Sequence, residues 1–303
     1  MLRFPGSRAL SAADRERQAA SLAALEAGGI PAQAAARLKD QRERAADAFT
    51  SDLTTNEHLL VRHAGYQPLG FVMGSAFHTV RVPTGTFNAL TTHEISEISR
   101  SILAGRQLAL GRLRQEAQLL GAHGVIGVEM REQEYEWAPY TYEFTAIGTA
   151  IRVPRAPEQE PFSCHLSGQK FWQLQAGYWP VGLHFGISCY WVVDRPTAND
   201  LDDGSAMSYY GNQEIVYYSR AVQTARRRAM ADLAASVDGS GAAGIVGVLV
   251  RSEIQPQSGG GALRVDFQVS GTAVAHAARA PQAKSGRPLT MLDLNTGSAT
   301  EIG

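Results

Sequence analysis

The stretch GAHGVIGVEM, from Gly121 to Met130, decides the architecture of this chain because nearly the same phrase occurs twice. The second version, GAAGIVGVLV, runs from Gly241 to Val250. Each version follows a segment whose apolar residues recur at helical spacing, and each leads into a short apolar run typical of a buried strand. A repeated passage from helix to strand predicts that the chain contains a repeated domain.

Two other pairs of segments repeat in the same order along the chain. AGYQPLGFVMG (64–74) is matched by AGYWPVGLHFG (176–186), and YEFTAIGTAI (142–151) is matched by VDFQVSGTAV (265–274). The offset grows from 112 to 120 to 123 residues through the three matches. Small insertions of this kind belong in loops, so the three matches favour a duplication.

These matches divide the chain into five predicted parts. An Ala-rich N-terminal helical segment precedes two copies of one domain, a short Pro- and Glu-containing linker joins the copies, and a polar, flexible tail follows them. In order, the predicted parts span residues 1–48, 49–153, 154–160, 161–280 and 281–303.

Each copy is predicted to fold as strand, helix, strand and strand. The last strand of the first copy alternates, with Tyr142 and Phe144 on one face and Thr141 and Glu143 on the other. The helix before the glycine phrase has a single apolar stripe, so we expect it to cover one face of an antiparallel sheet. The predicted fold class is therefore α+β, with one amphipathic helix on each sheet.

Eight glycines form the structural motif of the two copies. Gly121 and Gly241 stand at the ends of the predicted helices, where a positive φ is needed and glycine adopts it without Cβ strain. Gly127 and Gly247 interrupt buried strands, which indicates close approach of a helix or neighbouring backbone. The full set is Gly121, Gly124, Gly127, Gly148, Gly241, Gly244, Gly247 and Gly271.

The paired motifs resemble the YbjQ-like family, often labelled a heavy-metal-binding domain. Its pattern G-A-x-[AG]-[VI]-[VI]-G-V, followed by G-T-A-[VI], is met at 121–128 with 148–151 and again at 241–248 with 271–274. The resemblance implies two tandem copies of a dodecin-like α+β fold. It also implies homo-oligomeric rings, commonly five-membered in single-domain relatives, so the expected partner is the chain itself.

Composition restricts the class of protein. The chain is 44% hydrophobic and 19% charged with a formal net charge of -1, which gives no electrostatic reason to expect nucleic acid or a membrane as partner. The N-terminus becomes charged before an apolar signal segment forms. Two cysteines, Cys164 and Cys189, make no disulfide framework and suit a reducing compartment. We therefore expect a cytoplasmic protein.

The family label makes a divalent metal the cofactor to consider. Neither a Cys-x2-Cys nor a His-x3-His pair occurs, and His165 and His184 are the remaining candidate ligands. Symmetric association is able to gather one histidine from each subunit. Cys164 and Cys189 are better explained as small buried hydrophobes.

A row of carboxylates follows the first glycine phrase. Glu132, Glu134 and Glu136 share one face of a predicted strand. We interpret them as a solvated face or a charged edge that prevents aggregation, with a hard cation as the alternative.

The chain lacks the sequence motifs of common catalytic sites. It has no Gly-x-Ser-x-Gly elbow, no phosphate-binding loop and no metalloprotease helix, so we do not expect an enzyme. The leading hypothesis is a ring-forming structural or binding protein whose functional unit is a homo-oligomer. The alternatives are a metal-binding or metal-stress protein with sites at subunit contacts, and an adaptor that docks a protein partner through LTMLDL (289–294) in its tail.

Overall fold

A computed structural model describes most of the chain. The described residues are 11–44, 50–80, 91–135, 138–154, 160–174, 177–193, 214, 216–256, 262–276, 290–292 and 299–301. Residues 155–159, the greater part of the predicted linker, lie outside them.

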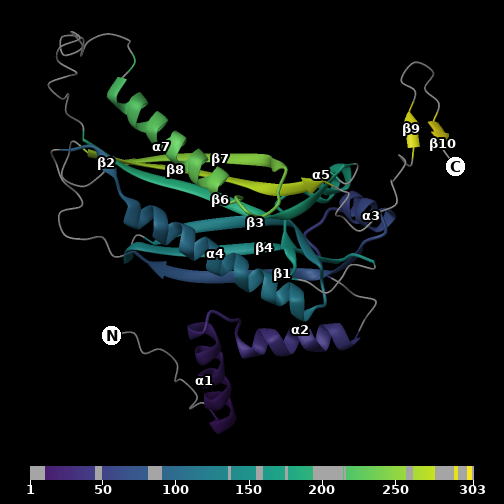
Figure 1. Cartoon of the computed structure of the whole chain (residues 1–303). Coiled ribbons are helices and arrows are strands. Elements are labelled where there is room, and N and C mark those ends of the chain that lie inside the picture. The colour runs from purple at the N-terminus through teal and green to yellow at the C-terminus, as the bar shows by residue number, and fades with distance from the viewer. Residues whose placement is uncertain are drawn as a thin grey trace.

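Two four-stranded sheets make up the body of the molecule (Figure 1). The first sheet has the order β1-β4-β3-β5 and the second has the order β2-β6-β8-β7. The strands of the first sheet are β1 (Gln67–Thr79), β3 (Gly124–Tyr135), β4 (Ala138–Arg152) and β5 (Phe162–Ser163). Those of the second are β2 (His93–Glu94), β6 (Tyr178–Val193), β7 (Gly244–Pro256) and β8 (Ala262–His276).

Within the described residues, two long helices and four shorter ones accompany the sheets. The long helices are α4 (Ser96–Leu119) and α7 (Val216–Ala235). The shorter ones are α1 (Ala12–Glu26), α2 (Ala32–Arg44), α3 (Thr55–His63) and α5 (Gly168–Leu174). Within the segment predicted as a flexible tail, β9 (Thr290–Leu292) pairs antiparallel with β10 (Ala299–Glu301).

The same sequence of elements builds both sheets. In the first half, β1, α4, β3 and β4 follow one another; in the second half, β6, α7, β7 and β8 do so. The last strand of each set, β4 or β8, lies in the middle and pairs antiparallel with both neighbours. The short strand β5 pairs parallel with β3, so the first sheet is mixed and the second is antiparallel. Helices together with these sheets confirm the predicted α+β class.

The glycines at 127 and 247 have a different role from the one predicted. Both have positive φ, +65° and +64°, and the strand register shifts beside each one, between Ile126 and Glu129 and between Val246 and Leu249. These positions are β-bulges that need a left-handed backbone. Close approach is not the reason at Gly127, because a Cβ there would meet nothing within 4 Å.

The other motif glycines lie at a helix end, in a turn and where side chains cross the sheet. Gly121 directly follows the C-cap of α4 and has a φ of +73°, as predicted. Gly241 has a φ of +72° but lies six residues beyond the end of α7 at Ala235, so it belongs to the turn before β7 and does not end the helix as predicted. A Cβ on Gly148 would lie 2.7 Å from the side chain of Val125, and Cβ atoms on Gly124 and Gly271 would collide with Phe162 and Ile245. A Cβ on Gly244 would meet nothing within 4 Å.

Each long helix lies against its sheet at a strand glycine outside the predicted motif set. A Cβ on Gly74 in β1 would collide with the backbone of Ala109 and Leu113 in α4. A Cβ on Gly186 in β6 would likewise collide with the backbone of Ala229 and Leu233 in α7. The two helices therefore sit on their sheets through the same backbone contact.

Helix α4 packs against both sheets. Its residues Ile102, Ala109 and Leu113 belong to one buried cluster with Val72 of β1 and Phe185 of β6. Helix α7 covers the opposite face of the second sheet (Figure 1). One helix on each sheet was predicted. For the second sheet this was wrong, because α7 covers one face and α4 of the first half covers the other.

The N-terminal helices α1 and α2 contact α4 through packing and hydrogen bonds. Leu38 of α2 is fully buried in the same cluster. Arg112 of α4 is buried and donates to the carbonyl oxygens of Leu25, Gly29 and Ser75 at 3.2, 3.0 and 2.6 Å. One guanidinium thereby satisfies carbonyls at the end of α1, in the α1–α2 turn and in β1.

Replacing Gly186 by Ala tests the contact between helix and sheet. We expect a loss of about 1–3 kcal/mol or more of unfolding free energy, because the backbone of α7 has to move away from the new methyl group. Gly111→Ala in α4 is the control, because a Cβ there meets nothing within 4 Å and removes about 1 kcal/mol of helix cost. Denaturant unfolding measures both; equal stabilities would contradict the contact.

Candidate functional site at the junction of the two sheets

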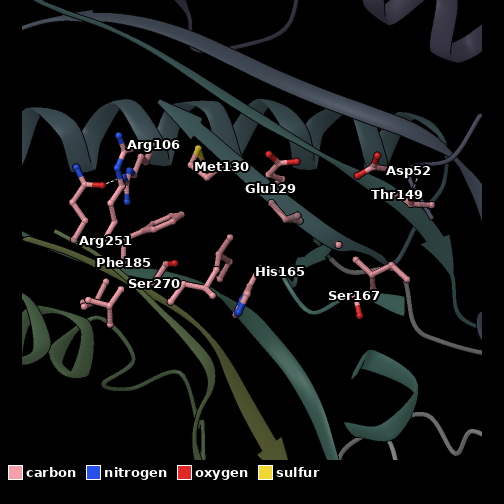
Figure 2. Close-up of a pocket in the computed structure, with 18 of the residues that line it drawn as sticks. Asp52, Arg106, Glu129, Met130, Thr149, His165, Ser167, Phe185, Arg251 and Ser270 are labelled. Carbon is pink, nitrogen blue, oxygen red and sulfur yellow. Dashed lines mark hydrogen bonds between the residues drawn. The ribbon is translucent and has the colours of Figure 1, made fainter. Parts of the chain in front are cut away.

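A cavity of about 430 Å³ lies where β3 of the first sheet faces β6, β7 and β8 of the second. We call it the junction cavity. In Figure 2, Arg106 and Arg251 lie toward its left end, Asp52 and Thr149 toward its right end, and His165 between them. Both bulged strands contribute to its wall, through Gly127 to Met130 and through Leu249 to Arg251. The cavity therefore belongs to neither half alone.

His165, a predicted metal candidate, is fixed by two hydrogen bonds beside the second bulge. Its Nε2 lies 2.5 Å from the carbonyl oxygen of Gly247, and its Nδ1 lies 2.7 Å from Oγ1 of Thr272. A carbonyl oxygen only accepts, so Nε2 carries the proton and Nδ1 accepts from the threonine hydroxyl. Burial lowers the pKa of His165, which favours this neutral form. Neither nitrogen has a lone pair left for a metal.

His184, the other metal candidate, lies at a different place in the fold. It is on β6, and its Nδ1 is 3.2 Å from Oγ of Ser236, just after α7. That hydroxyl donates to the carbonyl oxygen of Leu233 at 2.7 Å, so it accepts from the imidazole. Burial lowers the pKa of His184 as well. Within the part of the chain that the structure describes, no three His, Cys, Asp or Glu side chains gather to hold a metal.

Buried charges join the two sheets next to the junction cavity. Arg106 of α4 donates to Oε2 of Glu132 on β3 at 2.6 Å and also to the side-chain oxygen of Gln268 on β8. Arg106 and Gln268 are both buried. The guanidinium lies 5.5 Å from the centre of the Phe185 ring on β6, a cation–π contact. One arginine therefore connects a helix and three strands from both halves.

A second arginine also connects the two sheets, through a carboxylate that lies two residues after Glu132 on β3. Arg264 of β8 is only 3% exposed and donates to both carboxylate oxygens of Asp266 and, at 3.2 Å, to Glu134 of β3. Burial opposes the charge on Arg264, but Asp266 outweighs it and raises the arginine's pKa. Burial also raises the pKa of Asp266 against the pull of Arg264. We call Arg106, Glu132, Gln268, Arg264, Asp266 and Glu134 the buried polar cluster.

The carboxylate row of β3 was therefore misassigned. Glu132 and Glu134 accept hydrogen bonds from arginines that cross between the halves, and their side chains are 10% and 28% exposed. Glu136 lies outside the described residues. A buried ion pair contributes little net stability, but removing one partner leaves the other charge buried and unpaired. The pair therefore specifies which surfaces meet.

The two cysteines are buried and unoxidised. Cys164 and Cys189 are free thiols with no measurable exposure. Burial raises the pKa of Cys164 to about 12 and raises that of Cys189 as well. Thiols held in the protonated form are unreactive and poor metal ligands, which agrees with small buried hydrophobes.

No helix in the described parts of the chain is both long enough and apolar enough to cross a membrane.

A family model with the description "Putative heavy-metal-binding", YbjQ_1, matches residues 53–154. The chain is also similar to a protein of Mycobacterium tuberculosis (strain ATCC 25618 / H37Rv) named Encapsulin nanocompartment protein Rv1762c. The two are 28% identical over 243 residues, which are 78% of this chain and 88% of that protein. No solved structure matches the chain.

The family match confirms the YbjQ-like resemblance for the first predicted copy. It begins at Leu53, just before α3, and ends at Pro154, after β4. The match does not extend over the second predicted copy.

Removing one member of the buried polar cluster is expected to destabilise the chain strongly. Arg264→Met leaves Asp266 and Glu134 without their cation, which costs about 3–5 kcal/mol of unfolding free energy. Arg251→Met is the matched control on the neighbouring strand, because Arg251 pairs with Glu253 in solvent, where such pairs contribute about 0–1 kcal/mol. Similar losses in the two variants would mean that Arg264 is not buried between the halves.

The half-buried imidazoles of His165 and His184 predict a pH dependence of stability. Their pKa values are lowered below the ordinary 6.5 in the folded chain, so the unfolded chain binds more protons as the pH falls through that value. The contribution of these imidazoles to stability should therefore be fully present above that pH and decrease as the pH falls below it. His165→Gln should reduce that decrease, measured by denaturant midpoints. An unchanged pH slope in the variant would contradict a half-buried, neutral His165.

Proposed function

We propose that this chain is a non-enzymatic structural protein that acts as a homo-oligomer and belongs to an encapsulin-type nanocompartment. The observation that carries the proposal is its similarity to the mycobacterial Encapsulin nanocompartment protein. The alignment takes in 88% of that relative, so the likeness extends over nearly the whole of it. Members of a nanocompartment act through assembly, and this chain has surfaces suited to assembly.

Exposed apolar side chains support self-association. Phe77 on β1 is 62% exposed, and Leu249 and Val250 on β7 are 58% and 59% exposed. Both strands lie at the ends of their sheets, where backbone groups are open to pairing. Contiguous apolar residues on a sheet edge mark contact surfaces.

We further propose that the two halves are tandem copies of a dodecin-like domain. Equal strand order, the paired bulges at Gly127 and Gly247, and the paired contacts of Gly74 and Gly186 with their helices support this. Under this proposal the chain is a covalent dimer of one domain, and its assemblies are built from pairs.

A non-enzymatic role agrees with the chemistry of the junction cavity. The imidazole in its wall has both nitrogens engaged, and Arg106 is held by Glu132 and Gln268. Neither side chain is free to act on a substrate in this arrangement. We place the protein in the cytoplasm because its thiols are unpaired and buried.

The family match favours a second candidate, a metal-binding protein. The residues of one chain do not fit a heavy-metal site, since the bonding of His165 leaves it no lone pair and the described residues hold no suitable cluster. This candidate therefore requires ligands gathered between subunits. We also propose, as a third candidate, that the tail around β9 docks a protein partner.

The mass of the purified chain in solution tests the proposal. Light scattering after size exclusion should give several chains per particle, and electron microscopy should show closed particles or co-purification with a shell. A chain that remains monomeric at micromolar concentration would contradict the oligomeric role. In the same untagged preparation, stoichiometric zinc, copper or nickel that increases with assembly would favour the metal-binding candidate instead.

A further inference from the structure

The two halves contact each other through different, non-equivalent surfaces. The first half contributes the outer face of α4, the open edge of β3 and the short strand β2. The second half contributes the face of β6, the strand β5 and the open edge of β6. Each half therefore also has a surface equivalent to the one that the other half uses, and this equivalent surface takes no part in the contact within the chain.

The first of these contacts is a strand added to a sheet edge. The amides of Gly127 and Val128 donate to the carbonyl oxygens of Leu166 and Cys164, both at 2.9 Å. Cys164 in turn donates to Val125 at 2.8 Å. The segment that enters the second half thereby covers the edge of β3, and Val128 is only 5% exposed.

The matching edge of β7 is uncovered among the described residues. Val248 stands next to the bulge glycine as Val128 does, but it is 43% exposed. The segment that would match β5 is present in the first half, just before α3. Its Asp52 amide donates to Thr149 at 3.1 Å, as the His165 amide donates to Thr272 at 3.3 Å.

The second contact places a helix on the far face of a sheet. Arg106 and Leu110 of α4 are buried, with Arg106 against Phe185 of β6. The apolar side chains of β6 that point this way, Phe185 and Cys189 among them, are covered by the first half.

The matching surfaces are again exposed. The shared glycine contacts align Ala109 with Ala229, so Arg106 and Leu110 correspond to Arg226 and Met230 on the outer face of α7. Arg226 is exposed and Met230 is 41% exposed. On β1, Met73 and Phe77 correspond to Phe185 and Cys189 and are 45% and 62% exposed.

The third contact is short but follows the same rule. β2 pairs with the edge of β6, and the amide of Ile95 continues the pairing by donating to Cys189 at 2.8 Å. In the second half, Glu214 precedes α7 as Glu94 precedes α4, and it is exposed. The edge of β1, to which it would pair, is the end of the first sheet.

We propose that chains associate head to tail, with the second half of one chain contacting the first half of the next as the two halves contact each other within a chain. The occupant of the exposed β1 face is therefore α7 of a second copy of this chain. The occupant of the β7 edge is the segment 50–53 of the neighbouring copy on the other side of the chain. This inference rests on the proposed oligomeric function and names its interface. Halves would alternate along the assembly, which closes into a ring if the rotation allows.

Charge substitutions on the two predicted surfaces test the interface. Phe77→Glu on β1 and Met230→Glu on α7 should each reduce the particle to a single chain, because each buries a carboxylate without a partner. Leu22→Glu is the matched control, because Leu22 is 59% exposed on α1, outside both surfaces. Far-ultraviolet circular dichroism should show that all three variants are folded.

Mixed cross-linking tests the polarity directly and does not depend on losing assembly. One chain carries Met73→Cys and another carries Arg226→Cys, and the native thiols are buried. A short bis-maleimide should link the two variants in a mixture and link neither variant to itself. Links between two copies of the same variant would mean a symmetric back-to-back contact and would overturn the proposal.

The outcomes separate this inference from the proposed function. A monomeric wild-type chain defeats both. An oligomeric wild type whose mass survives Phe77→Glu and Met230→Glu, or whose cross-links join identical variants, defeats only the head-to-tail interface.

Discussion

The burial of α4 between two sheets is the constraint on which the rest of the structure depends. A single helix of 24 residues packs against β1 and β4 of its own half and against β6 of the other half. Its buried Arg106 reaches strands of both sheets, and Arg112 anchors the N-terminal helices. The helix therefore has to bury a second stripe that a helix on one sheet leaves exposed. The junction cavity and the buried polar cluster exist because of this second contact.

Much of the local fold was predictable because it depends on nearby residues. Strand alternation, the helical stripe and the cap glycine at 121 follow from backbone geometry and periodicity. The corresponding Gly241 has the predicted positive φ, but α7 ends earlier, at Ala235. The sequence marked the glycines in the strands but did not show that they form β-bulges. A glycine in a strand indicates either a left-handed backbone or a close neighbour, and the sequence alone does not distinguish them. The contacts of Gly74 and Gly186 with the helix backbones were not predicted, because no periodicity in the sequence marks a glycine as a helix contact.

The candidate site could not be predicted because it is made of long-range contacts. Charged residues alternating along β3 and β8 have the pattern of a solvated strand face, and the pattern contains no record of what covers that face. Glu132 and Glu134 were interpreted as a solvated face for this reason, yet they bond to arginines between the halves. The residue types did contain a hint of these contacts. Arg106 stands on an otherwise apolar side of α4, and the carboxylates on β3 are opposite in charge to the arginines on α4 and β8.

If α4 is the shared core, the two halves form one cooperative unit instead of two independent domains. Native-state hydrogen exchange measures this most directly, by comparing the opening free energies of amides in α4 with those in β6 and β8. The account predicts the same highest opening free energy in all three elements, with the second sheet losing protection only when α4 does. Protection of α4 that persists after β6 and β8 have exchanged, in a separate and cheaper opening, would contradict it.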